Sequence, residues 1–395
     1  MRPFFFLAFS TLFLSCSSQS ALKEMPATNL PVCGAAQIAR YMPELRGKHV
    51  GLVANQTSRI GQTHLVDTLL QLGVDIKAVF APEHGFRGEA GAGEHISDGK
   101  DPVTGIPVLS LYGKTKKPTG EMLEGIDVIV FDIQDVGARF YTYISTLHYV
   151  LEAAAEHHLK VIVLDRPNPN GFYIDGPVLE ESFQSFVGMH PIPIVHGLTM
   201  GELTGMILGE GWLKENPHVV VIPCEAYSHS IAYALPVRPS PNLPNDHAIL
   251  LYPSLCWFEG TEVSVGRGTP DPFQIIGFPD SNTGSFSFTP RNLPGIAPHP
   301  PFENKACKGF DLRQTQPTKK GEIELSWLLE MYRAYPDKPH FFLATGFFDK
   351  LCGTAQIREM VIAGKSAEEI RASWQPGLNQ YKAMRKQYLL YPDFE

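Results

Sequence analysis

The stretch DVIVFDIQDVGARFYTYISTLHYVLEAAAEHHLKVIVL, residues 127–164, contains the pattern of a strand, a helix and a second strand in succession. Residues 127–133 and 161–164 are short aliphatic runs, as in strands that are buried on both faces. Between them, residues 141–158 place apolar side chains along one helical stripe. Continuous aliphatic strands joined by a helix predict a parallel sheet that helices cover on both sides.

Segments of the same kind occur before and after this unit. The expected strands lie at 49–56, 76–80, 108–111 and 219–222, and the expected helices at 64–72 and 200–208. We therefore predict an α/β fold for residues 30–235, namely a Rossmann-like domain with a doubly wound, mostly parallel sheet that carries the catalytic site.

The chain changes character at about residue 235. Any regular period is broken there by Pro236, Pro239, Pro241, Pro244 and Pro253. Only residues 322–335 and 367–388 have a helical pattern again. We predict that residues 236–395 form a second, smaller α+β domain, which closes a cleft against the first.

The composition is that of a folded protein. Of the 395 residues, 44% are hydrophobic and 19% are charged, which excludes a wholly disordered chain. The net charge is -8, and no basic stripe with interleaved aromatic residues is present. We therefore predict no nucleic-acid partner.

The amino terminus resembles the signal sequence of a bacterial lipoprotein. Arg2 precedes an apolar run at residues 4–14, which is too short to span a bilayer as a helix. The run ends in Phe13-Leu14-Ser15-Cys16, which resembles the motif where a signal peptidase cuts before an acylated cysteine. We predict that residues 1–15 are a signal peptide and that Cys16 carries a lipid anchor. The protein would then lie on the periplasmic or cell-surface side of a bacterial membrane. An ordinary signal peptide with an incidental cysteine is the alternative.

Three expected strands end in dense polar clusters. These are residues 82–88 (PEHGFRG), residues 132–143 (DIQDVGARFYTY) and residues 165–171 (DRPNPNG). Ligands of open α/β sheets bind beyond the carboxyl ends of the strands. The three clusters therefore predict one binding site at this edge of the sheet.

The usual nucleotide and hydrolase motifs are missing from the sequence. It has no GxGxxG after the first strand and no GxSxG, Walker A or HExxH motif, and we predict no cofactor. His84, Asp132, Asp135 and Asp165 are of types that bind divalent metals, but their spacing is not diagnostic, so we predict no metal site. The remaining pattern, carboxylates flanked by arginines and aromatic residues, is typical of a glycosidase.

Glu83 is the sharpest catalytic candidate. The strand brings it to the edge of the sheet, and Pro82 and Gly85 fix the turn around it. The later glycines Gly88, Gly91 and Gly93 suggest a loop that closes over the substrate. The alternative is that Glu83 and His84 only organise that loop.

Several longer motifs together resemble one enzyme family. They are FAPEHGFRGEAGAGE, DIQDVGARFYTY, DRPNPNGF, PIVHGLTMGEL, PSPNLP and FEGTEVSVGRGT. In this order they resemble the exo-β-N-acetylmuramidase family, from about Cys33 to the carboxyl end. The resemblance implies an active site in a cleft between the two domains, and release of N-acetylmuramic acid from the non-reducing end of peptidoglycan fragments. It also implies that Glu83 is the catalytic residue.

We assign the remaining site residues on chemical grounds. His84 and Asp135 are further catalytic candidates beside Glu83. The lactyl carboxylate of muramic acid needs local cations in an acidic protein, and arginines bind carboxylates strongly unless they pair with neighbouring aspartates instead. The predicted substrate-binding residues are Arg87, Gln134, Arg139, Tyr141, Tyr143, Asp165, Arg166, Asn168, His196, Asn242, Glu262 and Arg267.

Two functions of other classes remain open at this point. One is a non-catalytic periplasmic protein that binds muropeptides with the same arginines and aromatic residues. The other is a metal-dependent hydrolase of another class.

Overall fold

The computed structural model describes residues 30–87, 98–315 and 321–395, of which Pro31–Glu395 forms one compact unit. The predicted signal peptide, Cys16 and the glycines at 88, 91 and 93 lie outside the described residues. All five described cysteines are free thiols. No helix in the described part of the chain is long and apolar enough to cross a membrane.

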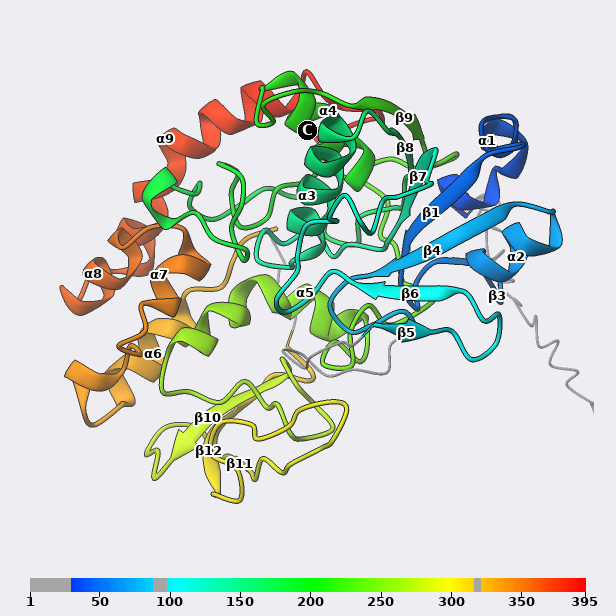
Figure 1. Ribbon diagram of the computed structural model, residues 1–395. Coiled ribbons are helices and arrows are strands. Elements are labelled where there is room, and N and C mark those ends of the chain that lie inside the picture. The colour runs from blue at the N-terminus through cyan, green and yellow to red at the C-terminus, as the bar shows by residue number, and fades with distance from the viewer. Residues whose placement is uncertain (1–29, 88–97, 316–320) are drawn as a thin grey trace, which may run out of the picture. The chain divides into compact units, whose positions relative to one another are not determined.

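A seven-stranded sheet forms the centre of the larger domain (Figure 1). Its strands, in the order of the sheet, are β5 (Gly99–Lys100), β6 (Pro107–Ser110), β4 (Asp75–Ala81), β1 (His49–Ala54), β7 (Val128–Asp132), β8 (Lys160–Leu164) and β9 (His218–Ile222). All neighbours pair in parallel except β5, which is antiparallel to β6. Without β5 this is the strand order of the Rossmann fold, with the switch point between β1 and β7.

Helices cover both faces of the sheet, as the sequence predicts. On one face, α1 (Ile38–Leu45) and α2 (Leu65–Gln71) pack on side chains of β1 and β4. On the other, α3 (Tyr143–Glu156) and α4 (Met200–Gly209) pack on β7 and β8. The predicted doubly wound, mostly parallel sheet is therefore confirmed, although α1 and β5 were not expected.

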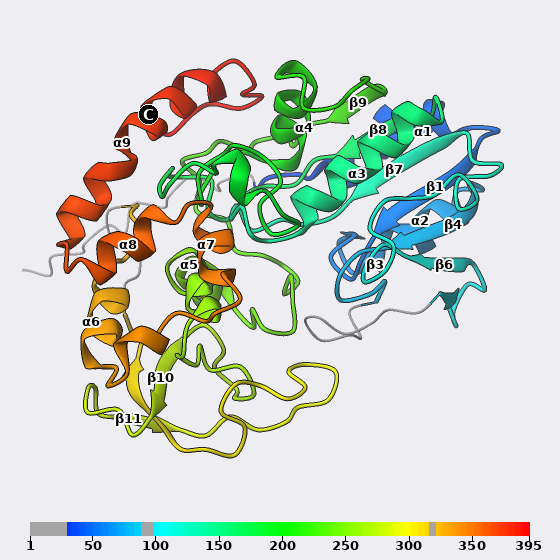
Figure 2. The same ribbon diagram turned by 60° about the vertical axis from the view of Figure 1, so that its left-hand side comes forward.

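The second domain contains a small antiparallel sheet and a group of helices (Figure 2). The sheet has the order β10 (Ile275–Pro279), β12 (Cys307–Asp311), β11 (Phe286–Phe288). The helices are α5 (Asp246–Leu255), α6 (Ser326–Ala334), α7 (Phe347–Cys352), α8 (Gln356–Ile362) and α9 (Ala367–Arg385). The remaining short elements are η1 (Gly34–Ala36), β2 (Arg59–Ile60), β3 (Thr63–His64), η2 (Glu181–Phe183), η3 (Cys256–Gly260) and η4 (Lys338–His340). A second α+β domain is confirmed, and its predicted limit near residue 235 stays a prediction.

Helix α5 forms in a proline-rich segment where the sequence predicted no regular structure. The Asn245 side chain caps it by accepting a hydrogen bond from the Ala248 amide at 2.9 Å. Pro253, inside the helix, cannot donate to the carbonyl of Ile249 four residues earlier. The Nδ2 atom of Asn170 lies 3.2 Å from that carbonyl oxygen and donates to it. A loop of the first domain thus replaces the missing helical hydrogen bond.

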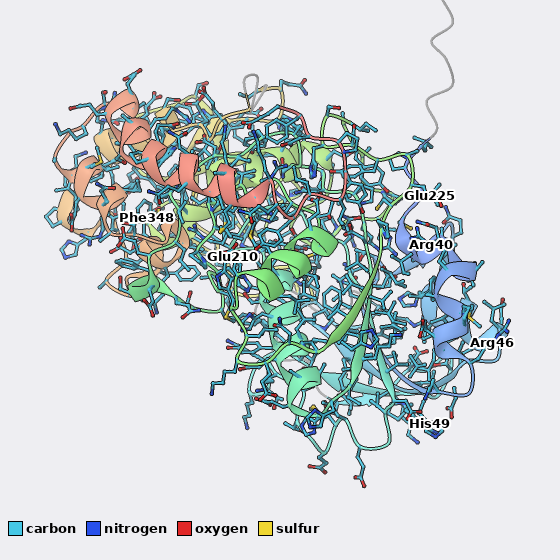
Figure 3. The ribbon with its side chains drawn as sticks, turned by 90° about the horizontal axis from the view of Figure 1, so that it is seen from above. Arg40, Arg46, His49, Glu210, Glu225 and Phe348 are labelled. Atoms are coloured by element: carbon cyan, nitrogen blue, oxygen red, sulfur yellow. The ribbon has the colours of Figure 1, made fainter. Side chains whose placement is uncertain are left out.

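The carboxyl-terminal segment packs back on the first domain. The Tyr388 hydroxyl donates to Glu210 Oε1 at 2.6 Å, and the Leu390 amide donates to Glu202 Oε1 at 2.9 Å. Figure 3 shows the end of α9 near Glu210, with Arg40 on α1 at the far side. The last residues of the chain therefore close over α4 of the larger domain.

Asp175 is the buried acceptor that connects α9 to the first domain. Its Oδ1 accepts from the indole nitrogen of Trp374 at 3.0 Å, and its Oδ2 accepts from the Ile323 amide at 2.7 Å and from Arg371. Asp175 is 3% exposed, so these donors have little access to water as a replacement partner.

We predict that Asp175→Ala lowers the free energy of unfolding by about 3 kcal/mol, because it leaves buried donors from two separate segments without an acceptor. Equilibrium unfolding in urea measures the change. Lys365→Ala, which removes an exposed ion pair with Glu369, is the control and should leave the midpoint unchanged. A midpoint for Asp175→Ala equal to that of the wild type would show that this cluster does not hold α9.

Candidate active site

A tight turn places Glu83 at the carboxyl end of β4. The amide of Gly85 donates to the carbonyl of Pro82 at 3.1 Å and closes the turn. His84 has φ 72° and Gly85 has φ 78°, so both lie in the left-handed region. That conformation is uncommon for a residue other than glycine, and such residues cluster at functional sites. Glu83 is half-buried there, whereas His84 is buried.

The carboxylate of Glu83 is held by side chains from two other strand ends. The hydroxyl of Thr142 donates to Glu83 Oε2 at 2.8 Å, and the hydroxyl of Tyr143 lies 3.2 Å from the Glu83 carbonyl oxygen. The hydroxyl of Tyr112, just after β6, also interacts with the Glu83 carboxylate. Burial, and then the charge of Glu83, raise the pKa values of Tyr112 and Tyr143, so both stay protonated donors.

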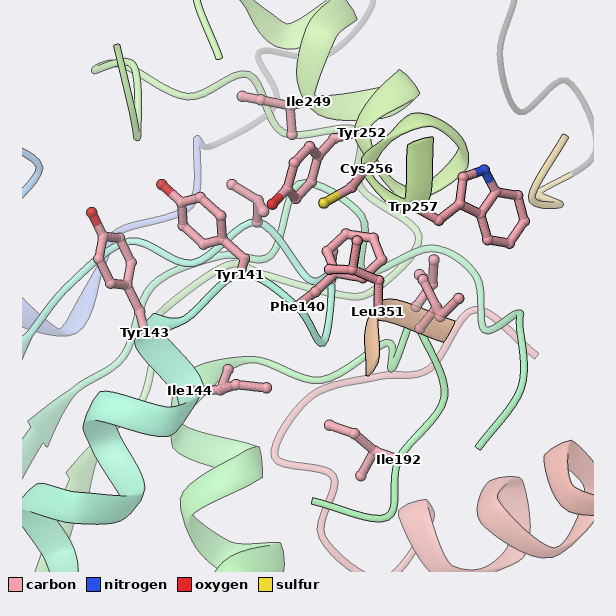
Figure 4. Close-up of a cluster of buried hydrophobic side chains, with 14 of the residues drawn as sticks. Phe140, Tyr141, Tyr143, Ile144, Ile192, Ile249, Tyr252, Cys256, Trp257 and Leu351 are labelled. Carbon is pink, nitrogen blue, oxygen red and sulfur yellow. The ribbon is translucent and has the colours of Figure 1, made fainter. Parts of the chain in front are cut away.

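A row of tyrosines joins this cluster to the second domain. Figure 4 shows Tyr143, Tyr141 and Tyr252 in sequence from the start of α3 towards α5. The ring centroids of Tyr141 and Tyr143 are 4.8 Å apart, and those of Tyr141 and Tyr252 are 6.0 Å apart. The Tyr141 hydroxyl donates to the carbonyl of Pro239 at 2.9 Å, and Gln56 Nε2 donates to the same oxygen at 2.9 Å. The proline-rich segment is therefore fixed beside Glu83.

A cavity of about 510 Å³ lies in the second domain next to this segment. Its lining includes the predicted residues Glu262 and Arg267, together with Ile296. Asn242, also a predicted site residue, donates from Nδ2 to the carbonyl of Ile296 at 2.7 Å. The positive charge of Arg267 acts to lower the pKa of the Tyr112 hydroxyl, and this hydroxyl also interacts with Glu83. The structure thus brings Asn242, Glu262 and Arg267 together at this cavity, and Arg267 links the cavity to the Glu83 cluster through Tyr112.

Three of the predicted arginines are paired with carboxylates. Arg87 binds both oxygens of Asp101 at 2.8 Å. Arg166 donates to Asp132 Oδ1 at 2.6 Å and Oδ2 at 2.9 Å, and both side chains are buried. Arg267 pairs with Glu259. The Arg166 side chain is 6% exposed and held by Asp132, and its contact with substrate stays a prediction.

Arg139, which was also predicted to bind substrate, has partners within the protein, and its contact with substrate stays a prediction. It is fully buried, and its two terminal nitrogens donate to four backbone carbonyls, those of Pro177, Ile192, Leu351 and Cys352, at 2.7–3.0 Å. Burial lowers its pKa to about 10. Through these hydrogen bonds Arg139 joins backbone segments of the two domains. The residue has no exposed surface.

Asp135 and His196 form a buried pair. His196 Nε2 lies 3.8 Å from Asp135 Oδ2. Asp135 accepts from the Gly137 amide at 2.6 Å, and His196 Nδ1 accepts from the Leu198 amide at 3.2 Å. Burial raises the pKa of Asp135 to about 7 and lowers that of His196 to about 3, so the imidazole is neutral with its proton on Nε2. A direct role for either in catalysis or binding stays a prediction.

Gln134, Asp165 and Asn168 build the loops at the strand ends. Gln134 Nε2 donates to the carbonyls of Asp135 and Pro167. Asn168 Nδ2 donates to the carbonyl of Leu198. Asp165 accepts from Thr199 Oγ1 at 2.7 Å, from the Tyr391 hydroxyl at 2.5 Å and from the Gly201 amide at 2.8 Å. All three are buried and donate or accept hydrogen bonds within the protein, and their contact with substrate stays a prediction.

The sequence interpretation missed two residues of the Glu83 cluster. Thr142 stands between Tyr141 and Tyr143 in a motif that was already singled out. Tyr112 follows the strand at 107–110, so its place at the carboxyl end of a strand was the available signal. No group of three or more metal-binding side chains occurs among residues 30–87, 98–315 and 321–395.

Comparison with known proteins identifies the same family for both halves of the chain. Residues 50–247 match the family described as exo-beta-N-acetylmuramidase NamZ, N-terminal, and residues 250–391 match its C-terminal counterpart. The chain is 40% identical over 377 residues to the peptidoglycan beta-N-acetylmuramidase NamZ of Bacillus subtilis (strain 168), which covers 89% of both chains.

Two crystal structures of DUF1343 family proteins from Bacteroides fragilis are also similar. One is 45% identical with a TM-score of 0.85, covering 92% of this chain and 99% of that one. The other is 30% identical with a TM-score of 0.79, covering 91% and 99%. Together with the motifs around Glu83, these matches show that the chain belongs to the exo-β-N-acetylmuramidase NamZ family.

Proposed function

We propose that this protein is an exo-acting glycoside hydrolase that releases N-acetylmuramic acid from the non-reducing end of peptidoglycan fragments during cell-wall turnover. Membership of the NamZ family supports the reaction. The observation that carries the assignment of residues is the position of Glu83, at the carboxyl end of β4 and hydrogen-bonded to Thr142.

Glu83 is suited to general acid/base catalysis on a glycosidic bond. In most glycosidases a carboxylic acid protonates the leaving oxygen, and it must lie within hydrogen-bonding distance of that oxygen. Thr142 fixes one carboxylate oxygen of Glu83, and Tyr143 fixes its backbone, so the side chain is oriented before the substrate binds. Tyr112 adds an aromatic side chain beside the carboxylate, of the kind on which sugars pack.

The cavity in the second domain is a candidate for the part of the site that surrounds the substrate. Polar groups of Glu262 and Arg267 face it, and apolar side chains such as Val263 and Phe302 line the rest. A pocket with mostly apolar walls and a few polar groups is typical of small-ligand sites. Arg267, which lines this cavity, also affects the Tyr112 hydroxyl that interacts with Glu83, and this link supports an exo-acting enzyme that holds one terminal sugar.

We also propose that the mature protein is a lipoprotein anchored through Cys16 on the periplasmic or cell-surface side of the membrane, after removal of residues 1–15. The motif Leu14-Ser15-Cys16 and the polar residues after it support this proposal. Peptidoglycan lies on that side of the membrane, so enzyme and substrate would meet.

The anchor is tested by expressing wild type and Cys16→Ser in a bacterium and separating membrane from soluble fractions. We expect the wild type in the membrane fraction and the variant in the soluble fraction, because Cys16→Ser removes the thiol that is acylated. Membrane association of both proteins to the same extent would exclude acylation of Cys16 as the anchor.

Turnover is tested by incubating the purified protein with a chromogenic N-acetylmuramic acid glycoside, with and without a chelator. We expect release of the chromophore in both conditions. Binding without release would favour a muropeptide-binding protein, and loss of release with the chelator would favour a metal-dependent hydrolase.

Replacement of Glu83 tests the catalytic assignment. We predict that Glu83→Gln keeps the fold, since glutamine still accepts from Thr142, and lowers kcat by about 100-fold or more because the proton donor is lost. Glu124→Gln, at an exposed carboxylate, is the control and should have the kcat of the wild type. Wild-type kcat in Glu83→Gln would remove Glu83 from the acid/base role.

A further inference from the structure

The arginines assigned to the lactyl carboxylate are already engaged within the protein. Arg87, Arg166 and Arg267 pair with carboxylates. Arg139 donates to backbone carbonyls. A substrate carboxylate would have to compete with these internal partners for the guanidinium groups. Recognition of a substrate anion therefore calls for a cation whose charge the protein leaves available.

Lys116 is such a cation. Its Nζ lies 4.2 Å from the centroid of the Phe186 ring. Among the residues that the structure describes, no carboxylate forms an ion pair with it. An aromatic ring holds an ammonium group without neutralising its charge. The half-buried Lys116 side chain is thus held by Phe186, with its charge available to a ligand.

Helix α3 fixes the aromatic ring on which Lys116 lies. The hydroxyl of Ser145 donates to the carbonyl of Phe186 at 2.7 Å. One turn further along α3, the ring of Tyr149 stacks on Phe186 with centroids 6.2 Å apart and planes inclined by 13°. The same helix begins at Tyr143, next to the Thr142 hydroxyl that holds Glu83. One rigid element therefore positions both the candidate catalytic carboxylate and the support of Lys116.

The segment that carries Lys116 starts at the active site. Tyr112, whose hydroxyl interacts with Glu83, has its ring centroid 6.5 Å from that of Phe186. At the other end, Lys117 Nζ lies 2.6 Å from Glu156 Oε1 and 3.2 Å from Glu152 Oε2 on α3. Residues 112–117 thus run from Glu83 to α3, and Lys116 lies between these two fixed points.

We propose that Lys116 binds a carboxylate of the substrate and so selects fragments that contain muramic acid. This inference rests on the proposed function. The carboxylate has two possible sources of the same chemistry: the free lactyl group of the sugar, or the peptide stem, which in peptidoglycan is joined to the lactyl group by an amide. Lys116 acts here in specificity, and Glu83 keeps the chemical step.

The test compares Lys116→Met, which keeps an unbranched side chain over Phe186 but loses the charge, with Lys114→Met, an exposed control two residues away. Three substrates are used: an N-acetylmuramic acid glycoside with a free lactyl carboxylate, the same glycoside as its neutral lactyl methylamide, and a peptide-bearing fragment. We expect Lys116→Met to lower kcat/KM about tenfold for a carboxylate substrate, mainly by raising KM, as for a lost charge-assisted hydrogen bond. The neutral methylamide should be hydrolysed equally by wild type and variant, and Lys114→Met should match the wild type throughout.

The substrates on which Lys116→Met has a lower kcat/KM than the wild type identify the source of the carboxylate. A lower kcat/KM with the free lactyl glycoside shows that Lys116 binds the lactyl carboxylate. A lower kcat/KM only with the peptide-bearing fragment shows that Lys116 binds a carboxylate of the peptide stem. Equal kcat/KM of Lys116→Met and wild type on both, or an equal loss on the methylamide, would overturn the inference. If the wild type hydrolyses none of the three, the proposed function is wrong. In that case the Kd values of the same compounds test the role of Lys116 in binding. A Kd for a carboxylate ligand that is about tenfold higher with Lys116→Met than with the wild type supports the inference, and an unchanged Kd overturns it.

Discussion

The hydrogen bonds made by three consecutive residues, Tyr141, Thr142 and Tyr143, hold the candidate active site together. Thr142 and Tyr143 bind the side chain and the backbone of Glu83, and Tyr141 binds the carbonyl of Pro239. These residues follow β7, at the switch point of the sheet, so they can reach both β4 and the second domain. Without them, Glu83 would lose two of its hydrogen bonds and the proline-rich segment would lose one of the two that hold the Pro239 carbonyl.

The polar residues beyond the strand ends divide into two layers with different tasks. The inner layer, which includes the Asp132–Arg166 pair and Arg139, is buried and bound to partners within the protein, and it sets the conformation of the loops. Its ion pairs are costly to bury and costly to break, so they favour one loop arrangement. The outer layer, Glu83 with Tyr112 and Lys116, is half-buried and is the part that can meet a ligand. In our proposal, an acidic protein binds an anionic substrate because Lys116 at the site keeps its charge available.

The sequence predicted the first domain well, because a parallel sheet covered on both faces requires continuous aliphatic strands that alternate with helices. It also placed Glu83 correctly at the end of β4. It did not predict α5, because the hydrogen bond that compensates Pro253 comes from Asn170, far away in the chain. It could not decide whether Arg139 and Arg166 face a ligand or an internal partner, because this depends on tertiary contacts that no local pattern contains. Tyr112 and Thr142 were missed because tyrosine and threonine are too common at loop ends to stand out.

A structure of the Glu83→Gln variant with a bound disaccharide of N-acetylmuramic acid and N-acetylglucosamine tests the central claim most directly. We predict that the glycosidic oxygen lies within about 3 Å of the side chain at position 83, a hydrogen-bonding distance. We also predict that the muramic acid ring lies in the cavity lined by Glu262 and Arg267, on the side of Tyr112. A disaccharide bound with its glycosidic oxygen beyond hydrogen-bonding reach of position 83 would contradict the account.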